Sequence, residues 1–397
     1  MKKALIITTI SGFLSKFEMN DVKILQEYGY DIHYASNFHN PTYSFDIGEL
    51  KKQGIKLHHV DIEKSPLAAA KNIKALKQVK EIIDREKIFL VHCHNPIGAV
   101  VGRVASHFSK MKPYVIYTAH GFHFYKGAPL KNWILYYTAE KFLAHKTDLI
   151  ITINQEDYNR AKKFRLKDNG RVEWIHGVGV DIERFQPRLE KRAVKRNELK
   201  IPKNVFHIVT VAELNKNKNQ KVIIQAIAHL GKKDIYYSIC GKGKNFKNLE
   251  KLIKKYHLEK QVHLLGYRKD IEEILQTADC FVFPSIREGL GIAAIEALAV
   301  GIPLIVADNR GTREYTKNNY NGIICNANNV KDFEKAIKRF YYDINYRKNL
   351  SSHCREIAQE YSIEAINKRM HQIYKMADQN VQKRIVKYGM ILWQKEK

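Results

Sequence analysis

This sequence of 397 residues lacks the marks of several common protein classes. Its five cysteines form no Cys-x-x-Cys pair, so the sequence indicates neither a disulfide framework nor a zinc site. We therefore expect the thiols to be reduced. No uninterrupted apolar run reaches about 18 residues, which argues against a membrane-spanning helix. A hydrophobic fraction of 45% excludes a disordered chain. What remains is a globular protein whose length suggests two or three domains.

Acidic residues are scarce. There are 41 Asp and Glu against 68 Lys and Arg, which gives a formal charge of +27. Such an excess is typical of proteins that bind nucleic acid, an anionic membrane surface or phosphorylated small molecules. The excess is spread over both halves, and no helix-turn-helix, finger spacing, RNP-like aromatic pair or basic zipper is present. We therefore expect no nucleic-acid partner, and a basic nucleic-acid-binding protein is the least favoured alternative.

Short apolar runs alternate with amphipathic stretches, twice along the chain. The first run, 4–8, follows Lys2 and Lys3 as in a signal peptide, but polar residues break it and no cleavage site follows, so a buried strand is expected. Runs without polar alternation are typical of parallel strands covered on both faces. The expected strands are 4–8, 31–35, 90–92, 114–118, 149–153, 206–211, 236–240, 262–265, 280–283, 303–307 and 322–325. Two such series predict two Rossmann-like α/β domains, with a boundary in the charged segment 181–199.

The segment 284–298 carries the most informative pattern of the chain. It leaves an expected strand, turns on Gly289 and Gly291, and opens a helix, an arrangement that presents free backbone N–H groups to a phosphate. Glu288 and Glu296 are eight residues apart, so both can point toward one cleft. Ionised carboxylates accept hydrogen bonds from the adjacent hydroxyls of a ribose or hexose. The alternative is a capped helix with one surface glutamate and one ion-paired glutamate.

The pattern P-S-x-x-E-G-L-G-x-x-x-x-E-A in this segment resembles the donor-site signature of family-4 glycosyltransferases, which have the GT-B fold. The similarity covers nearly the whole chain, and Thr118–Gly127 resembles the His-Gly segment of the bacterial capsule and exopolysaccharide subgroup. The resemblance implies two Rossmann-like domains that face each other across a cleft. We expect an acceptor-binding domain at 1–185, a donor-binding domain at 186–375, and a C-terminal helix at 376–397 that returns to the first domain.

The resemblance also implies roles for individual residues. Glu296 would bind the nucleotide ribose, Glu288 would bind the donor sugar, and His120 would hydrogen-bond that sugar from the facing domain. The remaining implied contacts concern the diphosphate: they are the Gly12 loop, the backbone N–H groups of Gly289 and Leu290, and the cations Lys218 and Arg287. Of these residues, Glu288, His120 and Lys218 are the expected catalytic ones.

One position departs from the family pattern: Glu213 stands where the family usually has arginine. A carboxylate repels phosphate, so the neutralising charge must come from other residues, for which Lys218 and Arg287 are the strongest candidates beside Lys216 and the pair Lys242/Lys244. The chain contains no Asp-x-Asp motif. We therefore expect a reaction without metal or other cofactor, and the resemblance implies retention of anomeric configuration.

Two further groups of residues call for an interpretation. His92 and His94 flank Cys93, but no third metal ligand is in view, so a packed strand end is favoured over a metal site. Residues 103–146 combine Lys and Arg with many aromatics and a single acid, Glu140. Packing in the core explains part of the aromatic content. Contact with an anionic membrane surface explains better than core packing why cationic and aromatic residues occur together here.

The expected protein is thus a cytoplasmic enzyme, peripheral at the inner face of the cell membrane. It would move a sugar from a nucleotide sugar, with UDP the favoured nucleotide, to a lipid-linked saccharide in capsule, exopolysaccharide or related glycan synthesis. A sugar-nucleotide 2-epimerase of the same fold is the enzymatic alternative, which product analysis with and without a lipid acceptor would distinguish.

Overall fold

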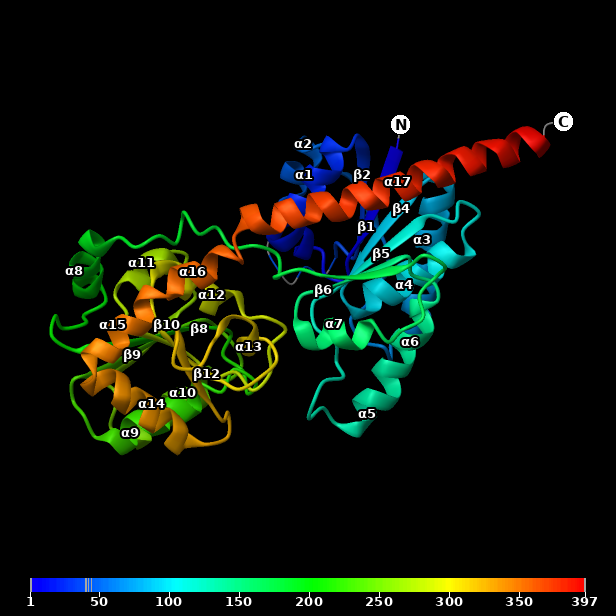
Figure 1. The fold of residues 1–397 in the computed structure, drawn as a ribbon. Helices are drawn as coiled ribbons and strands as arrows, with labels where there is room; N and C mark the ends of the chain where they lie inside the picture. The colour runs from blue at the N-terminus through cyan, green and yellow to red at the C-terminus, as the bar shows by residue number, and fades with distance from the viewer. Residues whose placement is uncertain (1, 40, 42, 44, 396–397) are drawn as a thin grey trace. The chain divides into compact units, whose positions relative to one another are not determined.

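The structure is a computed structural model that describes residues 2–39, 41, 43 and 45–395, with side chains to residue 387. The chain forms two compact units. The first comprises Met1–Val178 and Ile366–Lys397, and the second comprises Gly179–Ala365. Each unit is a parallel sheet with helices on both faces (Figure 1). Among the described residues, no helix is long and apolar enough to cross a membrane.

The sheet of the first unit has seven parallel strands in the order β3-β2-β1-β4-β5-β6-β7. The strands are β1 (Lys2–Ile7), β2 (Tyr30–Ser36), β3 (Lys56–His59), β4 (Leu90–His94), β5 (Tyr114–Ala119), β6 (Leu149–Thr152) and β7 (Arg171–Trp174). The expected first strand is therefore a central one, with Ala4 in register with Ile32 and Leu90. The expectation missed both edge strands, β3 and β7, because each exposes polar side chains and contains no apolar run.

Helices of the first unit follow most of its strands and bury their apolar sides against the sheet. They are the π-helical turn η1 (Leu14–Glu18), α1 (Met19–Glu27), α2 (Ile47–Lys52), α3 (Ala69–Glu86), α4 (Pro96–Phe108), α5 (Leu130–Asn132), the π-helical turn η2 (Trp133–Tyr137), α6 (Thr138–Ala144) and α7 (Gln155–Ala161). Val79 and Ile83 of α3 pack with Val91 and Val115 of the central strands in one core. This packing is what an apolar stripe at three- and four-residue spacing predicts.

The long helix α17 (Ile363–Lys395) belongs to the first unit from Ile366 onward. Its side chains bond to the strands of that unit: the Tyr374 hydroxyl lies 2.8 Å from His92 Nδ1, and Asp378 accepts a 2.7 Å hydrogen bond from Lys2. The return of the C-terminal helix to the first domain is thus confirmed. It begins ten residues before the expected limit of 376, because Ile366 and Met370 already pack in the first unit.

The second unit contains six parallel strands in the order β10-β9-β8-β11-β12-β13. Its elements are α8 (Leu189–Glu198), β8 (Phe206–Val211), α9 (Lys221–Leu230), β9 (Ile235–Cys240), α10 (Phe246–Lys255), β10 (Val262–Gly266), α11 (Ile271–Gln276), β11 (Cys280–Phe283), α12 (Ile292–Val300), β12 (Leu304–Ala307), α13 (Thr312–Tyr315), β13 (Gly322–Cys325), α14 (Val330–Tyr342), α15 (Ile344–Ser352) and α16 (Cys354–Gln359). All six expected strands are present.

The chain enters the second unit at Gly179, before the expected limit of 185. Val180 donates a backbone hydrogen bond to Tyr361 and accepts one from Ile363. A Cβ atom on Gly179, whose φ is +87°, would lie 2.9 Å from Ile363 Cα, so the close approach requires glycine. The charged segment in which the boundary was expected is not an open linker, since it contains α8, which ion-pairs with other residues of the second unit.

Candidate active site

The glycine turn between β11 and α12 has the geometry expected of a phosphate-binding loop. Gly291 has a φ of +99°, and a Cβ atom there would lie 2.6 Å from the Phe283 ring and 2.9 Å from the Tyr315 hydroxyl. Only glycine fits this turn. Gly291 is also the residue before α12, so the first backbone N–H groups of that helix, at its positive dipole end, face the turn.

An ion pair joins this turn to the loop after β8. Lys218 Nζ lies 2.5 Å from Glu288 Oε1, and both side chains are largely buried, with exposed fractions of 19% and 11%. The Lys218 ammonium also lies 5.1 Å from the Phe283 ring centre. Backbone bonds hold the two loops together, since Ile286 N–H donates to the Asn217 carbonyl and the Asn217 side chain donates to the Arg287 carbonyl. Lys218 and Glu288, predicted separately, thus belong to one site.

Two further loops of the second unit pack against these. The turn after β9 leads from this strand to α10. A Cβ atom on its Gly241 would lie 1.9 Å from the Ala212 carbonyl oxygen, and one on Gly243 would lie 2.2 Å from that of Leu214. These contacts fix the backbone of the loop that carries Lys218.

The loop after β12 contributes residues that the sequence reasoning missed. Arg310 is 7% exposed, and its Nε donates a 3.4 Å hydrogen bond to the Glu288 carbonyl. A Cβ atom on Gly311 would lie 2.9 Å from Glu288 Cβ, and the Asn309 side chain donates to the Ser285 carbonyl at 2.8 Å. Since these residues also follow a strand at the same end of the sheet, the rule that led to Glu288 could have found them.

The other predicted residues of the second unit lie as follows. Arg287 is exposed, Gly289 is half-buried and Leu290 is buried, all within the same turn. Glu296 is half-buried and is the fifth residue of α12, just over one turn from its start. Glu213, at the position of the usual arginine, is exposed. A guanidinium therefore does lie beside the turn that contains Glu288, although it comes from Arg310 instead of residue 213.

Gly12 and His120, the predicted residues of the first unit, lie close together. Phe13 packs its ring 4.9 Å from that of His120, and a Cβ atom on Gly12 would lie 2.4 Å from the Tyr43 carbonyl oxygen. His120 follows β5, and burial lowers its pKa to about 4, so its imidazole is neutral near pH 7.

A group of buried titratable side chains surrounds His120. His94, at the end of β4, places Nδ1 3.2 Å from His120 Nε2, and Glu18 Oε1 lies 3.4 Å from the same nitrogen. Burial, reinforced by Asp21, raises the pKa of Glu18 well above its usual value. The strand end His92–His94 is fully buried, as expected, but the acids that join it come from η1 and α1, distant in sequence.

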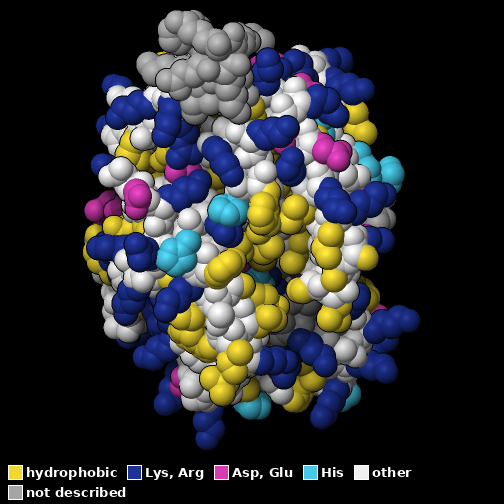
Figure 2. Space-filling model, turned by 90° about the vertical axis from the view of Figure 1, so that its right-hand side faces the viewer, with side chains coloured by type: hydrophobic (Ala, Val, Ile, Leu, Met, Phe, Trp, Pro, Cys, Tyr) yellow, Lys and Arg dark blue, Asp and Glu magenta, His cyan; other side chains and the backbone are white. Residues whose placement is uncertain are grey.

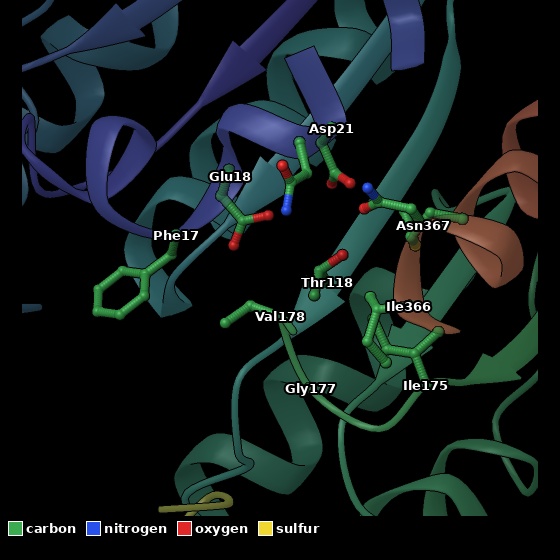
Figure 3. A pocket seen from close by; sticks show the side chains of 11 residues that line it. Phe17, Glu18, Asp21, Thr118, Ile175, Gly177, Val178, Ile366 and Asn367 are labelled. Carbon is green, nitrogen blue, oxygen red and sulfur yellow. The ribbon is translucent and has the colours of Figure 1, made fainter. Parts of the chain in front are cut away.

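A small pocket, with room for about one water molecule, opens beside these acids (Figure 3). Its walls come from the first unit, and the side chains of Glu18, Asp21, Thr118 and Asn367 are directed toward it. The structure therefore places polar groups of η1, α1, β5 and α17 around one small enclosed space.

Two Rossmann-like units, the second of which carries carboxylates, a lysine and a helix N-terminus at the carboxyl end of its sheet, define the GT-B class of glycosyltransferases. The comparisons with known sequences agree. Residues 3–154 match the family described as "Glycosyl transferase 4-like", and residues 191–357 match "Glycosyl transferases group 1". The chain belongs to this glycosyltransferase family and is a glycosyltransferase.

The chain is similar in sequence to named glycosyltransferases and in fold to a solved structure. EpsD of Bacillus subtilis strain 168, named as a glycosyltransferase, is 35% identical over 94% of this chain and 96% of its own length. An Escherichia coli enzyme named UDP-Gal:alpha-D-GlcNAc-diphosphoundecaprenol alpha-1,3-galactosyltransferase is 30% identical over 69% of this chain and 71% of its own. HepE of Anabaena, solved with UDP, has the same fold, with a TM-score of 0.77, 19% identity, and coverage of 95% and 100% of the two chains.

Proposed function

We propose that this glycosyltransferase moves a sugar, with retention, from a UDP-sugar to a lipid-linked saccharide, and that it needs no metal ion at the donor diphosphate. The observation that carries the proposal is the buried pair of Lys218 and Glu288 beside the N-terminus of α12. A lysine at this place can neutralise a phosphate, and a carboxylate can accept bonds from sugar hydroxyls. The printed name of the Escherichia coli relative, which contains both UDP-Gal and a diphosphoundecaprenol acceptor, supports these substrate classes.

Charge that develops on the departing nucleoside diphosphate is the main electrostatic demand of such a reaction. Lys218, the exposed Arg287 and the N–H groups of Gly289 and Leu290 can meet it without metal. Arg310 adds a guanidinium beside the Glu288 backbone, which compensates for the glutamate at position 213. Within this proposal Glu296 binds the ribose, and His120 and the Gly12 loop serve the donor from the first unit.

The lipid-linked acceptor implies a membrane surface, and the first unit offers a suitable face. Leu130, Ile134, Leu135 and Phe142 of α5, η2 and α6 are 75%, 66%, 57% and 62% exposed, and we call these four residues the apolar ridge. The exposed lysines 126, 131 and 141 flank it. On the face of the molecule in Figure 2, hydrophobic side chains gather among many Lys and Arg and few acidic side chains. Apolar side chains ringed by cations are the pattern that binds anionic lipid surfaces.

Part of the aromatic content of residues 103–146 serves the core instead. Phe122 and Phe124 are 3% and 0% exposed, and they stack on each other with ring centres 4.7 Å apart. Glu140, the single acid, is also buried and ion-pairs with Arg103. The membrane proposal therefore rests on the apolar ridge and its lysines alone.

The proposal is tested by incubating the purified protein with UDP-, GDP- and ADP-sugars and a saccharide linked through diphosphate to a polyprenol. We expect acceptor-dependent release of UDP without added Mg²⁺ or Mn²⁺, and a product with the anomeric configuration of the donor. Glu288→Gln abolishes transfer, whereas Glu259→Gln, an exposed glutamate in the same unit, does not. Strict dependence on added Mg²⁺, or release of free nucleotide without acceptor, would contradict it.

A further inference from the structure

Three donor atoms in the first unit converge as the ligands of a metal ion do. Glu18 Oε1 lies 3.6 Å from His94 Nδ1 and 3.4 Å from His120 Nε2, and the two imidazole nitrogens are 3.2 Å apart. A tetrahedral zinc ion with bonds of about 2.0–2.2 Å separates its ligand atoms by about 3.3–3.6 Å. The three atoms thus already form one face of such a tetrahedron.

One carboxyl oxygen of this cluster is left without a hydrogen bond, although the carboxyl group of Glu18 also bonds to Asp21. Glu18 Oε1 is buried, the side chain is 5% exposed, and this oxygen has no hydrogen-bond partner among the described residues. An unpaired polar atom in the interior costs free energy, and a cation between the three side chains would satisfy it.

The neighbouring group of Asp21, His92 and His94 is less suited to a metal. Both nitrogens of His92 are already engaged: Nδ1 lies 2.8 Å from the Tyr374 hydroxyl, and Nε2 lies 2.7 Å from the Thr118 hydroxyl. His92 Nδ1 is also 3.8 Å from Asp21. These contacts make His92 a packed support for the strand end and leave the cluster of Glu18, His94 and His120 as the ligand set.

We propose that Glu18, His94 and His120 bind a zinc ion, with the fourth position left open to water. Two imidazoles and one carboxylate with an open position are a ligand set that zinc favours. The site belongs to the first unit and differs from the sequence expectation of no metal. The ligand atom of His120 is Nε2, so Nδ1 is outside the ligand set. If the proposed function holds, the ion would hold in place the imidazole ring that faces the donor sugar.

The test uses the full-length protein, stripped of metal with a chelator, dialysed and titrated with Zn²⁺ and with Co²⁺ as a spectroscopic probe. We expect one ion per chain, visible absorption typical of tetrahedral Co²⁺ that Zn²⁺ abolishes, and a Zn²⁺-dependent rise in the melting temperature of the wild type. Binding of less than one ion, or no rise in melting temperature at saturating Zn²⁺, would overturn the proposal even if no variant folded.

Variants assign the ligands. Glu18→Gln keeps the side-chain shape and should weaken Co²⁺ binding by more than about 100-fold, a loss larger than outer-shell changes cause. His58→Gln, from the separate His33–His58 contact at 2.8 Å, should bind Co²⁺ as the wild type does, and Asp21→Asn, beside Glu18, should weaken binding less than Glu18→Gln does. Unchanged binding by Glu18→Gln, or a larger loss of binding in Asp21→Asn than in Glu18→Gln, would refute this ligand set. Because these experiments measure metal binding, their outcome does not depend on whether the proposed sugar transfer is observed.

Discussion

Replacing Lys218 with alanine should reduce the rate of sugar transfer more than it reduces donor binding. The Lys218 side chain is 19% exposed, so its charge acts in a partly desolvated site. Two unit charges about 4 Å apart at an effective dielectric of about 20 interact by about 4 kcal/mol. Charge on the leaving diphosphate grows in the transition state, and loss of one electrostatic donor typically lowers kcat by about 10²–10³-fold. Lys218→Ala should therefore lower kcat by about that factor, with a smaller rise in KM.

The assay measures acceptor-dependent UDP release at saturating and at limiting donor concentrations. Lys218→Arg keeps the charge and should recover part of the lost rate. Lys216→Ala removes an exposed lysine two residues away and should leave the rate unchanged. A fall of less than about 10-fold in Lys218→Ala, with normal folding by circular dichroism, would show that the pair with Glu288 is structural and that the diphosphate is neutralised elsewhere.

Three other substitutions address the remaining parts of the molecule. Arg310→Gln should lower turnover by about 10–100-fold, the value of a lost charge-assisted hydrogen bond, and wild-type kinetics would remove this residue from the donor site. Ile134→Asp on the apolar ridge should reduce sedimentation with anionic vesicles but leave transfer to a short-chain soluble acceptor intact; unchanged sedimentation would contradict the membrane face. Arg103→Met leaves the buried Glu140 unpaired and should lower the free energy of unfolding by about 3–5 kcal/mol, whereas pairing it with Glu140→Gln should restore part of that stability in denaturant titrations.

The fold was largely predictable because the central strands of both units are covered on both faces. Strands such as β1 and β11 are therefore uninterrupted apolar runs, and apolar runs are what the sequence pattern detects. The edge strand β3 reads Lys-Leu-His-His and β7 reads Arg-Val-Glu-Trp, with side chains that are half-buried or exposed. Such strands are specified by their pairing with a neighbour, which a single run of residues does not reveal.

From residue spacing alone, the candidate site was predictable only where its residues are close in sequence, whereas Gly12, His120 and Lys218 were predicted from the family resemblance. Glu288 and Glu296 lie on one strand–turn–helix segment, so their spacing carries the signal. The place of Arg310 after a strand was a signal for this residue, but its contact with the Glu288 backbone was not predictable, because it depends on β11 and β12 being neighbours in the sheet. The same holds for Glu18 and His120, about a hundred residues apart, which meet because β1, β4 and β5 are adjacent.

The structure shows that part of the large positive charge of the chain is buried and paired, which the net charge alone does not reveal. In α8, Lys195 bonds to Asp270 and Glu273, while Arg196 bonds to Asp279 and to backbone carbonyls near the start of β8. Lys195 and Arg196 are 6% and 5% exposed, so these cations stabilise the second unit and cannot form part of a surface for a polyanion. The segment that reads as a basic linker is thus an internal tie between α8, α11 and β11. Charge count alone overstates how many cations face a ligand, because a cation that is buried and paired no longer contributes to the surface potential.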